Sequence, residues 1–287
     1  MSLRDEMMHI SSLYGIKPTR ARGQNFLIDE KTYEEIIEAA DLKKEETVLE
    51  VGPGLGFLTT LLSKNSKKVI AVELDKKLSQ TLENRLQVEQ IKNVSIFNED
   101  VMNFTGDWAK ETEQVDKNKL VVVANLPYTI TSIFLRFFVG GNIKNILPTR
   151  FVLMLQKEVA QRIVAQAGAL SKLALSVQLY ADVSIVKIVS RKCFWPSPEV
   201  DSAVISIKRT DRWTKKLGSH ERELALLRII RIGFSAKRKM LKANLAAGLQ
   251  VPVDSILEYF SQLGINPSAR PQELSLENWL GLLPFLE

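Results

Sequence analysis

Residues Asn125, Leu126, Pro127 and Tyr128 place hydrogen-bond acceptors beside a flat aromatic ring at one point of the chain. They follow the apolar run 121–124, which is typical of a buried strand. The amide oxygen of Asn125 and the carbonyl of Leu126, held by Pro127, can accept hydrogen bonds from an exocyclic amine. The ring of Tyr128 can stack on a flipped base. Taken alone, the stretch is equally typical of an ordinary strand-to-helix turn.

A second stretch that could form part of a binding site is the glycine-rich segment "LEVGPGLGFLTT" at 49–60. Gly52, Gly54 and Gly56 follow an expected strand and precede an expected helix, so the backbone there can approach a ligand closely. A dinucleotide-binding loop would need a glycine at Phe57, and the loop also lacks the Lys-Ser/Thr ending of a phosphate loop. The spacing therefore argues against NAD and against a nucleoside triphosphate.

Two acidic side chains follow the next two expected strands. Glu73 ends a strand about 20 residues after the glycines, where a carboxylate can accept hydrogen bonds from both ribose hydroxyls. Asp100 follows the third strand, and we assign Leu74 and Val101, which come directly after the two acids, to the same pocket. This set suits a nucleoside cofactor without a pyrophosphate, namely S-adenosylmethionine. A tight turn with solvated acids is the alternative.

The elements that would position these residues alternate between strands and helices from residue 47 to about 156. Apolar strands separated by amphipathic helices predict a parallel sheet covered on both faces. Asn125 then lies at the carboxyl end of the fourth strand, at the edge that lines the ligand crevice of such sheets. The segment 101–118 is expected to be a polar loop. Strands are expected at 47–52, 67–74, 94–100, 119–127 and 150–156.

In the C-terminal third, the alternation of strands and helices gives way to paired strands and then to helices alone. Two paired strands are expected at 182–190 and 202–210, and the polar stretch 211–222 is interpreted as a linker. Helical spacing without intervening strands then predicts a small all-helical domain. The expected helices cover 223–234, 237–249, 255–264 and 276–286. We therefore divide the chain into an α/β domain at 1–210 and a helical domain at 211–287.

The composition sets the class of protein. The chain has 287 residues, of which 45% are hydrophobic and 25% charged, as in ordinary soluble globular proteins. Its net charge of +6 favours an acidic partner such as nucleic acid only weakly. Cys193 is the only cysteine, and His9 and His220 are the only histidines, so neither an intramolecular disulfide nor a metal site is expected. The absence of a signal peptide and of a membrane-spanning run predicts a cytoplasmic protein.

Eight short motifs occur in an order that is highly specific. The sequence resembles the KsgA-type ribosomal RNA adenine N6,N6-dimethyltransferases over about residues 17 to 280. This resemblance implies a Rossmann-like, seven-stranded S-adenosylmethionine-dependent methyltransferase domain with a C-terminal helical domain. The motifs are "GQNFL" (23–27), "EVGPGLG" (50–56), "VEL" (72–74), "ED" (99–100), "NLPY" (125–128), "FWPSPEVDSAV" (194–204), "FSAKRKMLKANL" (234–245) and "ARPQELS" (269–275).

The resemblance also implies roles for the residues that match these motifs. Asn25 and Leu27 would contact the cofactor, Gly52 would lie under its methionine part and Glu73 would bind its ribose. Asp100 would bind the edge of its adenine.

On the substrate side, Asn125 would touch both the cofactor and the target amine, and Tyr128 and Phe194 would sandwich the target base. Phe194 precedes Pro196 and Pro198, which predict a rigid, exposed loop. An ordinary pair of core aromatics is the alternative for Phe194 and Trp195.

One departure from the family pattern lies close to that loop. Glu199 stands where the family usually has a lysine, which would weaken the positive field beside the base pocket. The stretch 165–177 also lacks a tyrosine-glycine pair often found before its helix. Neither change is expected to abolish activity.

The segment "SAKRKMLK" at 235–242 is dense in cations and is expected on one short helix. Lys237, Arg238, Lys239 and Lys242 are predicted to contact RNA phosphates, which position RNA without reading its sequence. A solvated helix face is the alternative.

The leading hypothesis is methyl transfer from S-adenosylmethionine to N6 of two adjacent adenosines near the 3′ end of small-subunit ribosomal RNA. The expected partner is that RNA or an immature 30S-type particle, with the protein acting as a monomer. An Erm-type methyltransferase of large-subunit RNA is the alternative enzyme. A ribosome-assembly protein or a relative of the mitochondrial transcription factors is the non-enzymatic alternative.

Overall fold

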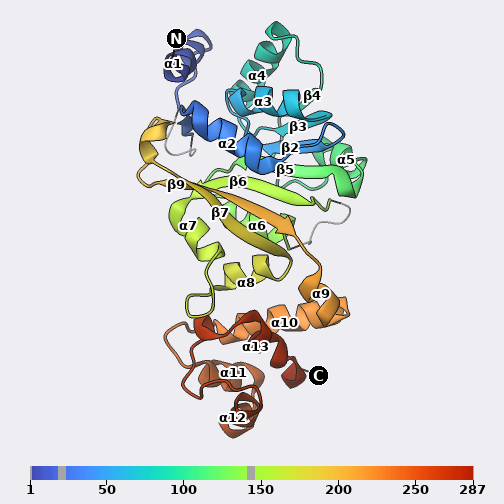
Figure 1. Ribbon diagram of the computed structural model, residues 1–287, viewed down its shortest axis with the longest axis vertical. Coiled ribbons are helices and arrows are strands. Elements are labelled where there is room, and N and C mark those ends of the chain that lie inside the picture. The colour runs from blue at the N-terminus through green and yellow to red at the C-terminus, as the bar shows by residue number, and fades with distance from the viewer. Residues whose placement is uncertain (1, 19–23, 141–145, 287) are drawn as a thin grey trace. The chain divides into compact units, whose positions relative to one another are not determined.

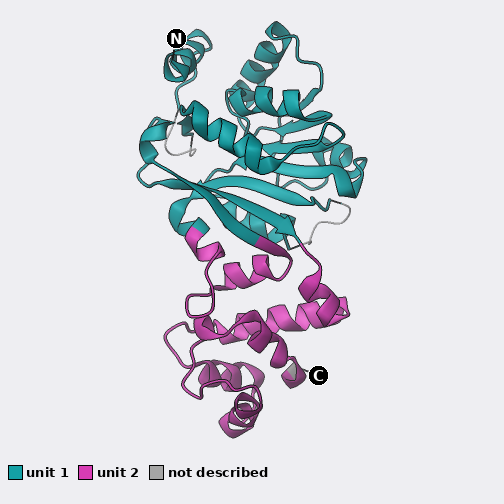
Figure 2. Ribbon diagram, viewed as in Figure 1, with its two compact units in different colours: residues 1–160, 183–209 teal, residues 161–182, 210–287 magenta. Residues whose placement is uncertain are grey.

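The structure is a computed structural model that describes residues 2–18, 24–140 and 146–286 (Figure 1). The chain divides into two compact units. The first unit comprises residues 1–160 and 183–209, and the second comprises residues 161–182 and 210–287 (Figure 2). The second unit thus includes a segment, 161–182, that precedes the last two strands in the sequence. The motif that begins at Gly23 starts outside the described residues.

A seven-stranded sheet forms the centre of the first unit (Figure 1). Its strand order is β4-β3-β2-β5-β6-β9-β7. Strands β2 to β6 run parallel to one another, and β9 runs antiparallel to β6. The sheet strands are β2 (Thr47–Val51), β3 (Lys68–Val72), β4 (Val94–Phe97), β5 (Leu120–Asn125), β6 (Arg150–Gln156), β7 (Ala181–Val189) and β9 (Ser202–Arg209). The predicted α/β class and seven-stranded sheet are confirmed. All five strands expected between 47 and 156 are present.

Alternate residues of the central strands face the two helical layers. Val48, Val69 and Val121 belong to one buried cluster with residues of the helices α2, α3 and α4. The side chain of Asp75 begins α4 by accepting hydrogen bonds from the backbone nitrogens of Lys77 and Leu78, at 2.9 and 3.2 Å. The bounds are α1 (Leu3–Leu13), α2 (Glu30–Ala40), α3 (Phe57–Asn65), α4 (Lys76–Val88), α5 (Asp107–Glu113), α6 (Thr131–Phe138) and α7 (Lys157–Ile163).

Helix α5 corrects the expectation of a polar loop at 101–118. Trp108 on this helix is fully buried and stacks on Phe138 of α6, with ring centroids 6.1 Å apart. Phe134 and Phe138 stack on each other at 4.1 Å. A single tryptophan in a polar stretch is enough to fix this helix, because its burial removes a large apolar surface from water. The local pattern showed it poorly, since Phe138, on which Trp108 stacks, lies 30 residues later and, among the described residues, only Phe104 is a nearby ring partner.

A small second sheet joins two distant parts of the first unit. Strand β1 (Phe26–Leu27) pairs antiparallel with β8 (Phe194–Trp195), with Phe26 opposite Trp195 and Leu27 opposite Phe194. The rings of Phe26 and Trp195 also stack, with centroids 6.4 Å apart. Phe194 is only 4% exposed; in the loop that follows, which was expected to be exposed, Ser197 and Glu199 are exposed but Pro198 is buried.

The second unit is all-helical apart from the first two residues of β7. Its helices are α8 (Lys172–Gln178), α9 (Arg212–Leu217), α10 (His220–Gly233), α11 (Leu241–Leu249), α12 (Val253–Gln262) and α13 (Leu276–Gly281), and the last residues of α7 also belong to it. The expected linker 211–222 is instead α9 and the start of α10, because Trp213 and Leu217 are buried at 8% and 2% exposure. Short 3₁₀ turns lie at Lys117–Lys119, Arg191–Cys193, Pro271–Glu273 and Leu283–Leu286.

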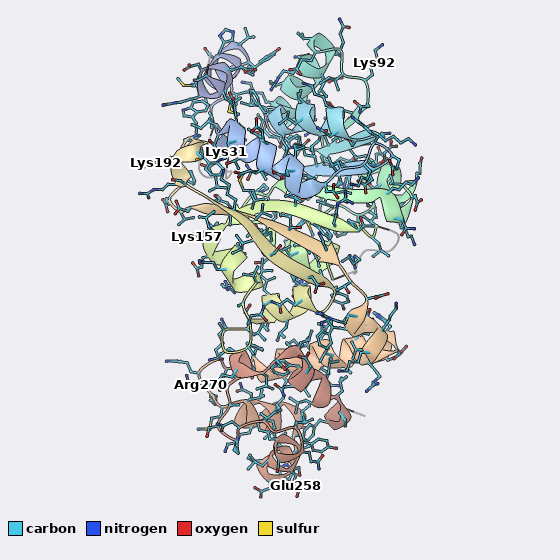
Figure 3. All side chains as sticks on the ribbon, viewed as in Figure 1. Lys31, Lys92, Lys157, Lys192, Glu258 and Arg270 are labelled. Atoms are coloured by element: carbon cyan, nitrogen blue, oxygen red, sulfur yellow. The ribbon has the colours of Figure 1, made fainter. Side chains whose placement is uncertain are left out.

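The surfaces of both units carry many charged side chains, several of which are labelled in Figure 3: Lys31, Lys92, Lys157 and Lys192 on the first unit, and Glu258 and Arg270 on the second. Within the described ranges, no helix has the length and apolarity needed to cross a bilayer. The same residues contain no group of three or more histidine, cysteine or acidic side chains that could hold a metal ion.

Candidate active site

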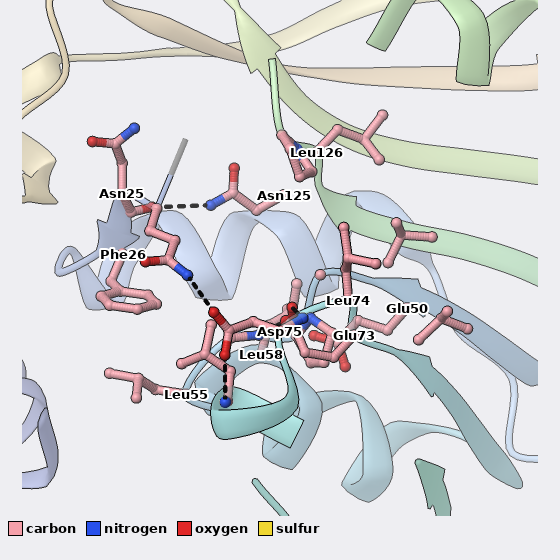
Figure 4. A pocket seen from close by; sticks show the side chains of 18 of the residues that line it. Asn25, Phe26, Glu50, Leu55, Leu58, Glu73, Leu74, Asp75, Asn125 and Leu126 are labelled. Carbon is pink, nitrogen blue, oxygen red and sulfur yellow. Dashed lines mark hydrogen bonds between the residues drawn. The ribbon is translucent and has the colours of Figure 1, made fainter. Parts of the chain in front are cut away.

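A cavity of about 730 Å³ opens in the first unit beside the carboxyl ends of β2, β3 and β5 (Figure 4). It is the crevice expected at this edge of a parallel sheet. Every residue of the first unit that we predicted as catalytic or cofactor-binding lines it. These residues are Asn25, Leu27, Gly52, Gly54, Glu73, Leu74, Asp100, Val101, Asn125, Leu126, Pro127, Tyr128 and Phe194.

The glycines of the loop after β2 are required by the backbone and by its neighbours. Gly52 and Gly54 have φ of +68° and +59°, in the left-handed region that disfavours other residues. A Cβ on Gly54 would lie 3.1 Å from Cε1 of Phe26, which is tighter than ordinary van der Waals contact. The loop therefore needs glycine both to turn and to let β1 approach the cavity.

Glu73 connects the loops that follow β2 and β3. Its Oε2 accepts a hydrogen bond from the backbone nitrogen of Gly54 at 3.1 Å, and its Oε1 accepts one from that of Asp75 at 2.9 Å. The side chain is 7% exposed, and burial raises its pKa even though these bonds lower it. Each carboxylate oxygen can accept more than one bond, so the predicted contact with ribose hydroxyls remains compatible with this geometry.

The other predicted cofactor residues differ in exposure. Leu74 is 72% exposed at the rim of the cavity, whereas Val101 is 5% exposed. The Oδ1 of Asp100, an exposed residue, accepts a hydrogen bond from the backbone nitrogen of Met102 at 2.8 Å. This side of the cavity therefore offers apolar surface for a flat ring, with the carboxylate of Asp100 at its edge.

Asn125, the last residue of β5, reaches across the cavity toward β1. Its Nδ2 donates to the backbone carbonyl of Asn25 at 3.5 Å, and its Oδ1 lies on the opposite side of the amide (Figure 4). The next residue is held by a hydrogen bond from the backbone nitrogen of Leu126 to the carbonyl of Met154, at 3.0 Å. The contact with Asn25 thus engages the amide nitrogen of Asn125 and not its Oδ1.

Tyr128 forms another part of the cavity wall. Its hydroxyl lies 2.9 Å from Oγ of Ser202, a fully buried residue of β9, and burial raises the tyrosine pKa. This contact fixes the direction of the ring. Phe194 lines the same cavity from β8 but is packed within the hydrophobic core, so less of its ring is available than we expected.

Glu50 is a cavity residue to which the sequence analysis gave no role. It is 1% exposed, and its Oε2 has no hydrogen-bond partner within the described ranges. Burial raises its pKa to about 8, and the nearby charge of Glu73 adds to this effect, while Thr59 opposes it. A charged residue inside the otherwise apolar strand "TVLEV" was the available signal. Met7 of α1 also lines the cavity and lacked any such signal.

The four predicted RNA-binding residues lie in the second unit. Lys237, Arg238 and Lys239 are exposed on a turn between α10 and α11, and Lys242 is half-buried in the first turn of α11. The expectation that one short helix carries the whole cluster is therefore wrong. Helix α11 begins only at Leu241, after the three exposed cations.

Comparison with known proteins fits this geometry. The sequence matches the family described as "Ribosomal RNA adenine dimethylase" over residues 17–287. The chain belongs to this family. It is therefore an S-adenosylmethionine-dependent ribosomal RNA adenine dimethyltransferase.

Named relatives and solved structures support the same family assignment. The chain is 38% identical to "Ribosomal RNA small subunit methyltransferase A" of Dehalococcoides mccartyi, over 97% of this chain and 91% of the relative. The protein of the same name in Staphylococcus aureus is 34% identical, over 94% of this chain and 90% of that relative. A dimethyladenosine transferase from Plasmodium falciparum superposes with a TM-score of 0.75 at 28% identity, and the match covers 91% of this chain and 97% of that structure. The 23S rRNA methyltransferase ErmE superposes with a TM-score of 0.71 at 25% sequence identity, and the match covers 91% of this chain and 99% of ErmE.

The residues of the cavity fit the family's cofactor. S-adenosylmethionine supplies a methyl group on a cationic sulfonium and also carries an ammonium group. The buried carboxyl oxygen of Glu50 without a partner suits a cation, and Gly52 and Gly54 allow close approach of the backbone. The carboxylate of Glu73 suits a pair of hydroxyls.

We predict that Glu50→Gln stabilises the protein without cofactor increasingly as the pH rises. The unfolded chain releases the Glu50 proton near its ordinary pKa of 4.5, whereas the folded chain holds it up to about 8. The folded state thus binds more protons in this interval, and Glu50 makes the free energy of unfolding fall as the pH increases. Thermal unfolding of both proteins should show a difference in the free energy of unfolding that grows by about 3–4 kcal/mol between pH 5 and pH 8. A gap that is constant over this range would contradict the prediction.

We predict that Glu73→Ala weakens cofactor binding, because the ribose hydroxyls lose a charged acceptor and two backbone N–H groups lose their partner. The expected loss is roughly 1.5–3 kcal/mol. Calorimetric titration of the folded variant measures it. Glu73→Gln is the matched control, because it keeps one acceptor oxygen and should be less affected. Unchanged affinity in Glu73→Ala would remove this residue from the site.

Proposed function

We propose that this enzyme transfers methyl groups to N6 of two adjacent adenosines near the 3′ end of small-subunit ribosomal RNA, and that it takes part in small-subunit biogenesis in the cytoplasm. The substrate would be the RNA itself or an immature 30S-type particle. The names of the Dehalococcoides mccartyi and Staphylococcus aureus relatives support the small-subunit assignment.

The observation that carries the proposed chemistry is the orientation of the Asn125 amide. Because Nδ2 donates to the carbonyl of Asn25, Oδ1 is the atom left to accept a hydrogen bond from the target amine. The carbonyl of Leu126 would accept the second amine hydrogen. These two acceptors hold the nitrogen lone pair away from the adenine ring, so that it points toward the methyl donor. Catalysis then rests on positioning and on oriented acceptors, without a strong general base.

The target base would stack on Tyr128, whose ring is fixed by its contact with Ser202. Phe194 would form the opposite wall of the base pocket, which requires more of its ring to be uncovered than its 4% exposure shows. Glu199, the departure from the family pattern, is exposed, and its backbone carbonyl accepts a hydrogen bond from Nη1 of Arg191 at 3.1 Å. Its negative charge would modulate RNA binding beside this wall.

The second unit would bind RNA through the cations of the turn before α11. Lys237, Arg238 and Lys239 are exposed, and within the part of the chain that the structure describes none of them forms an ion pair. Cations without a protein partner are available to phosphates. The large-subunit alternative is supported by likeness to ErmE, whereas the curated relatives quoted above carry the small-subunit name.

We predict that Asn125→Ala lowers turnover by about 10²–10³, the range found when one preorganised polar group is removed from an active site. The fold should persist, because the residue ends a strand and is only half-buried. The measurement is methyl incorporation into small subunits at saturating cofactor, with circular dichroism to confirm folding. A folded variant that methylates at the native rate would defeat the assignment of Asn125 as an acceptor for the amine.

Tyr128 provides a second test. Tyr128→Ala should lower turnover through lost stacking of roughly 1–3 kcal/mol. Tyr128→Phe should have a milder effect, because it keeps the ring and removes only the contact with Ser202. If the phenylalanine variant were as impaired as the alanine variant, the hydroxyl and not the ring would be the important group.

We predict that replacing Lys237, Arg238 and Lys239 with alanine weakens binding to small subunits and makes its salt dependence shallower. Fewer counterions are released when fewer phosphates are neutralised, so the log–log slope should change by about 2–3. The affinity for cofactor should stay the same. An unchanged salt slope would show that these cations are only a solvated surface.

A further inference from the structure

The turn formed by residues 234–240 joins α10 to α11 and carries three exposed cations. A short exposed segment of this kind loses conformational freedom when it binds, unless the protein already holds it in one shape. Its cations form no ion pairs within the described residues, so they do not hold it. The shape of this turn must therefore come from other groups.

The two ends of the turn are fixed by packing and by a backbone hydrogen bond. Phe234 is 5% exposed and its ring stacks on Trp279 of α13, with centroids 5.7 Å apart. At the other end, the backbone nitrogen of Leu241 donates to the carbonyl of Ala269 at 2.8 Å. Neither contact reaches the middle of the turn, where the cations begin.

The middle is held by a buried amide. Asn244 of α11 is 4% exposed, and its Nδ2 donates to the carbonyl of Gly233 at 2.6 Å and to that of Ala236 at 3.0 Å. The same carbonyl of Ala236 accepts a hydrogen bond from the backbone nitrogen of Lys239 at 3.0 Å. One side chain thus joins the end of α10 to the residue directly before Lys237.

A buried amide with this arrangement is specific to asparagine. One of its N–H groups bonds the carbonyl of Gly233, the last residue of α10, and the other bonds the carbonyl of Ala236 in the turn, in addition to the bond from Lys239. Leucine has a similar volume but no donor, and alanine lacks both the volume and the donor. Loss of the amide leaves the cations in the chain but releases the backbone that presents them.

We propose that Asn244 is a positioning residue for RNA binding, which sets the shape of the basic turn and acts through Lys237, Arg238 and Lys239. The inference rests on the proposed function of this turn. It assigns to a buried side chain, which does not itself touch RNA, part of the affinity for the small subunit.

The test compares Asn244→Ala and Asn244→Leu with the native enzyme in binding to immature small subunits. We expect affinity to fall about five- to thirty-fold in both variants, as for a lost buried hydrogen-bonding group. The salt dependence should become shallower, because fewer cations engage phosphates together. In methylation assays the KM for subunits should rise while kcat and the affinity for cofactor stay the same.

Asn278→Ala is the matched control for a general loss of stability. The Oδ1 of Asn278 accepts hydrogen bonds from the backbone nitrogen and Oγ of Ser275 at 3.1 and 3.0 Å, which caps α13 in the same unit. Binding is measured at a temperature where circular dichroism shows all variants folded. If Asn278→Ala weakens binding as much as Asn244→Ala, the effect is structural and the inference is wrong.

A double-mutant cycle decides whether Asn244 acts through the cations. In a chain that already lacks Lys237, Arg238 and Lys239, Asn244→Ala should cause no further loss of affinity. An equal loss in both backgrounds would overturn the inference. If the triple alanine variant binds normally, the proposed function of the turn fails. If that variant is weak while both Asn244 variants bind with native affinity and salt slope, only the role of Asn244 fails.

Discussion

One buried carboxylate links the parts of the active-site cavity. Glu73 accepts backbone hydrogen bonds from Gly54 and from Asp75, so the loops after β2 and β3 are fixed relative to each other. Asp75 in turn begins α4 and accepts a hydrogen bond from Nε2 of Gln24 at 3.2 Å, next to β1. Such bonds are strong in a site shielded from water. The glycine loop, the first turn of α4 and the segment before β1 are therefore joined through two neighbouring carboxylates, those of Glu73 and Asp75.

The carboxyl groups of the cavity also carry an electrostatic strain in the protein alone. Burial disfavours the charged form of both Glu50 and Glu73, and the charge of Glu73 raises the pKa of Glu50 further. A cationic ligand relieves both effects, because it supplies the opposite charge inside the same cavity. A bound cation would therefore lower the pKa values of both carboxyl groups.

The sequence predicted the parts of the site that depend on local pattern. Asn125, Glu73 and the glycine loop all follow apolar strands, and parallel strands bring their carboxyl ends to one edge. It did not predict Met7 or the pairing of β1 with β8, because these depend on contacts between distant residues. The basic turn was expected to be helical from its spacing, but Phe234 and Asn244 hold it in another shape through contacts outside that window. Helix α9 was missed for the same reason, since burial of Trp213 and not propensity fixes it.

The pairing of β1 with β8 has a consequence for synthesis of the protein. One wall of the cavity is made by Leu27 and Phe194 lying side by side, although the chain emerges from the ribosome in order. Closing so long a loop is slow and entropically unfavourable until the later strand is available. Strand β9, which lies between β6 and β7, is also made late. The nascent enzyme therefore cannot complete its cavity until most of its chain has been translated, so an unfinished chain has no complete site for methyl transfer.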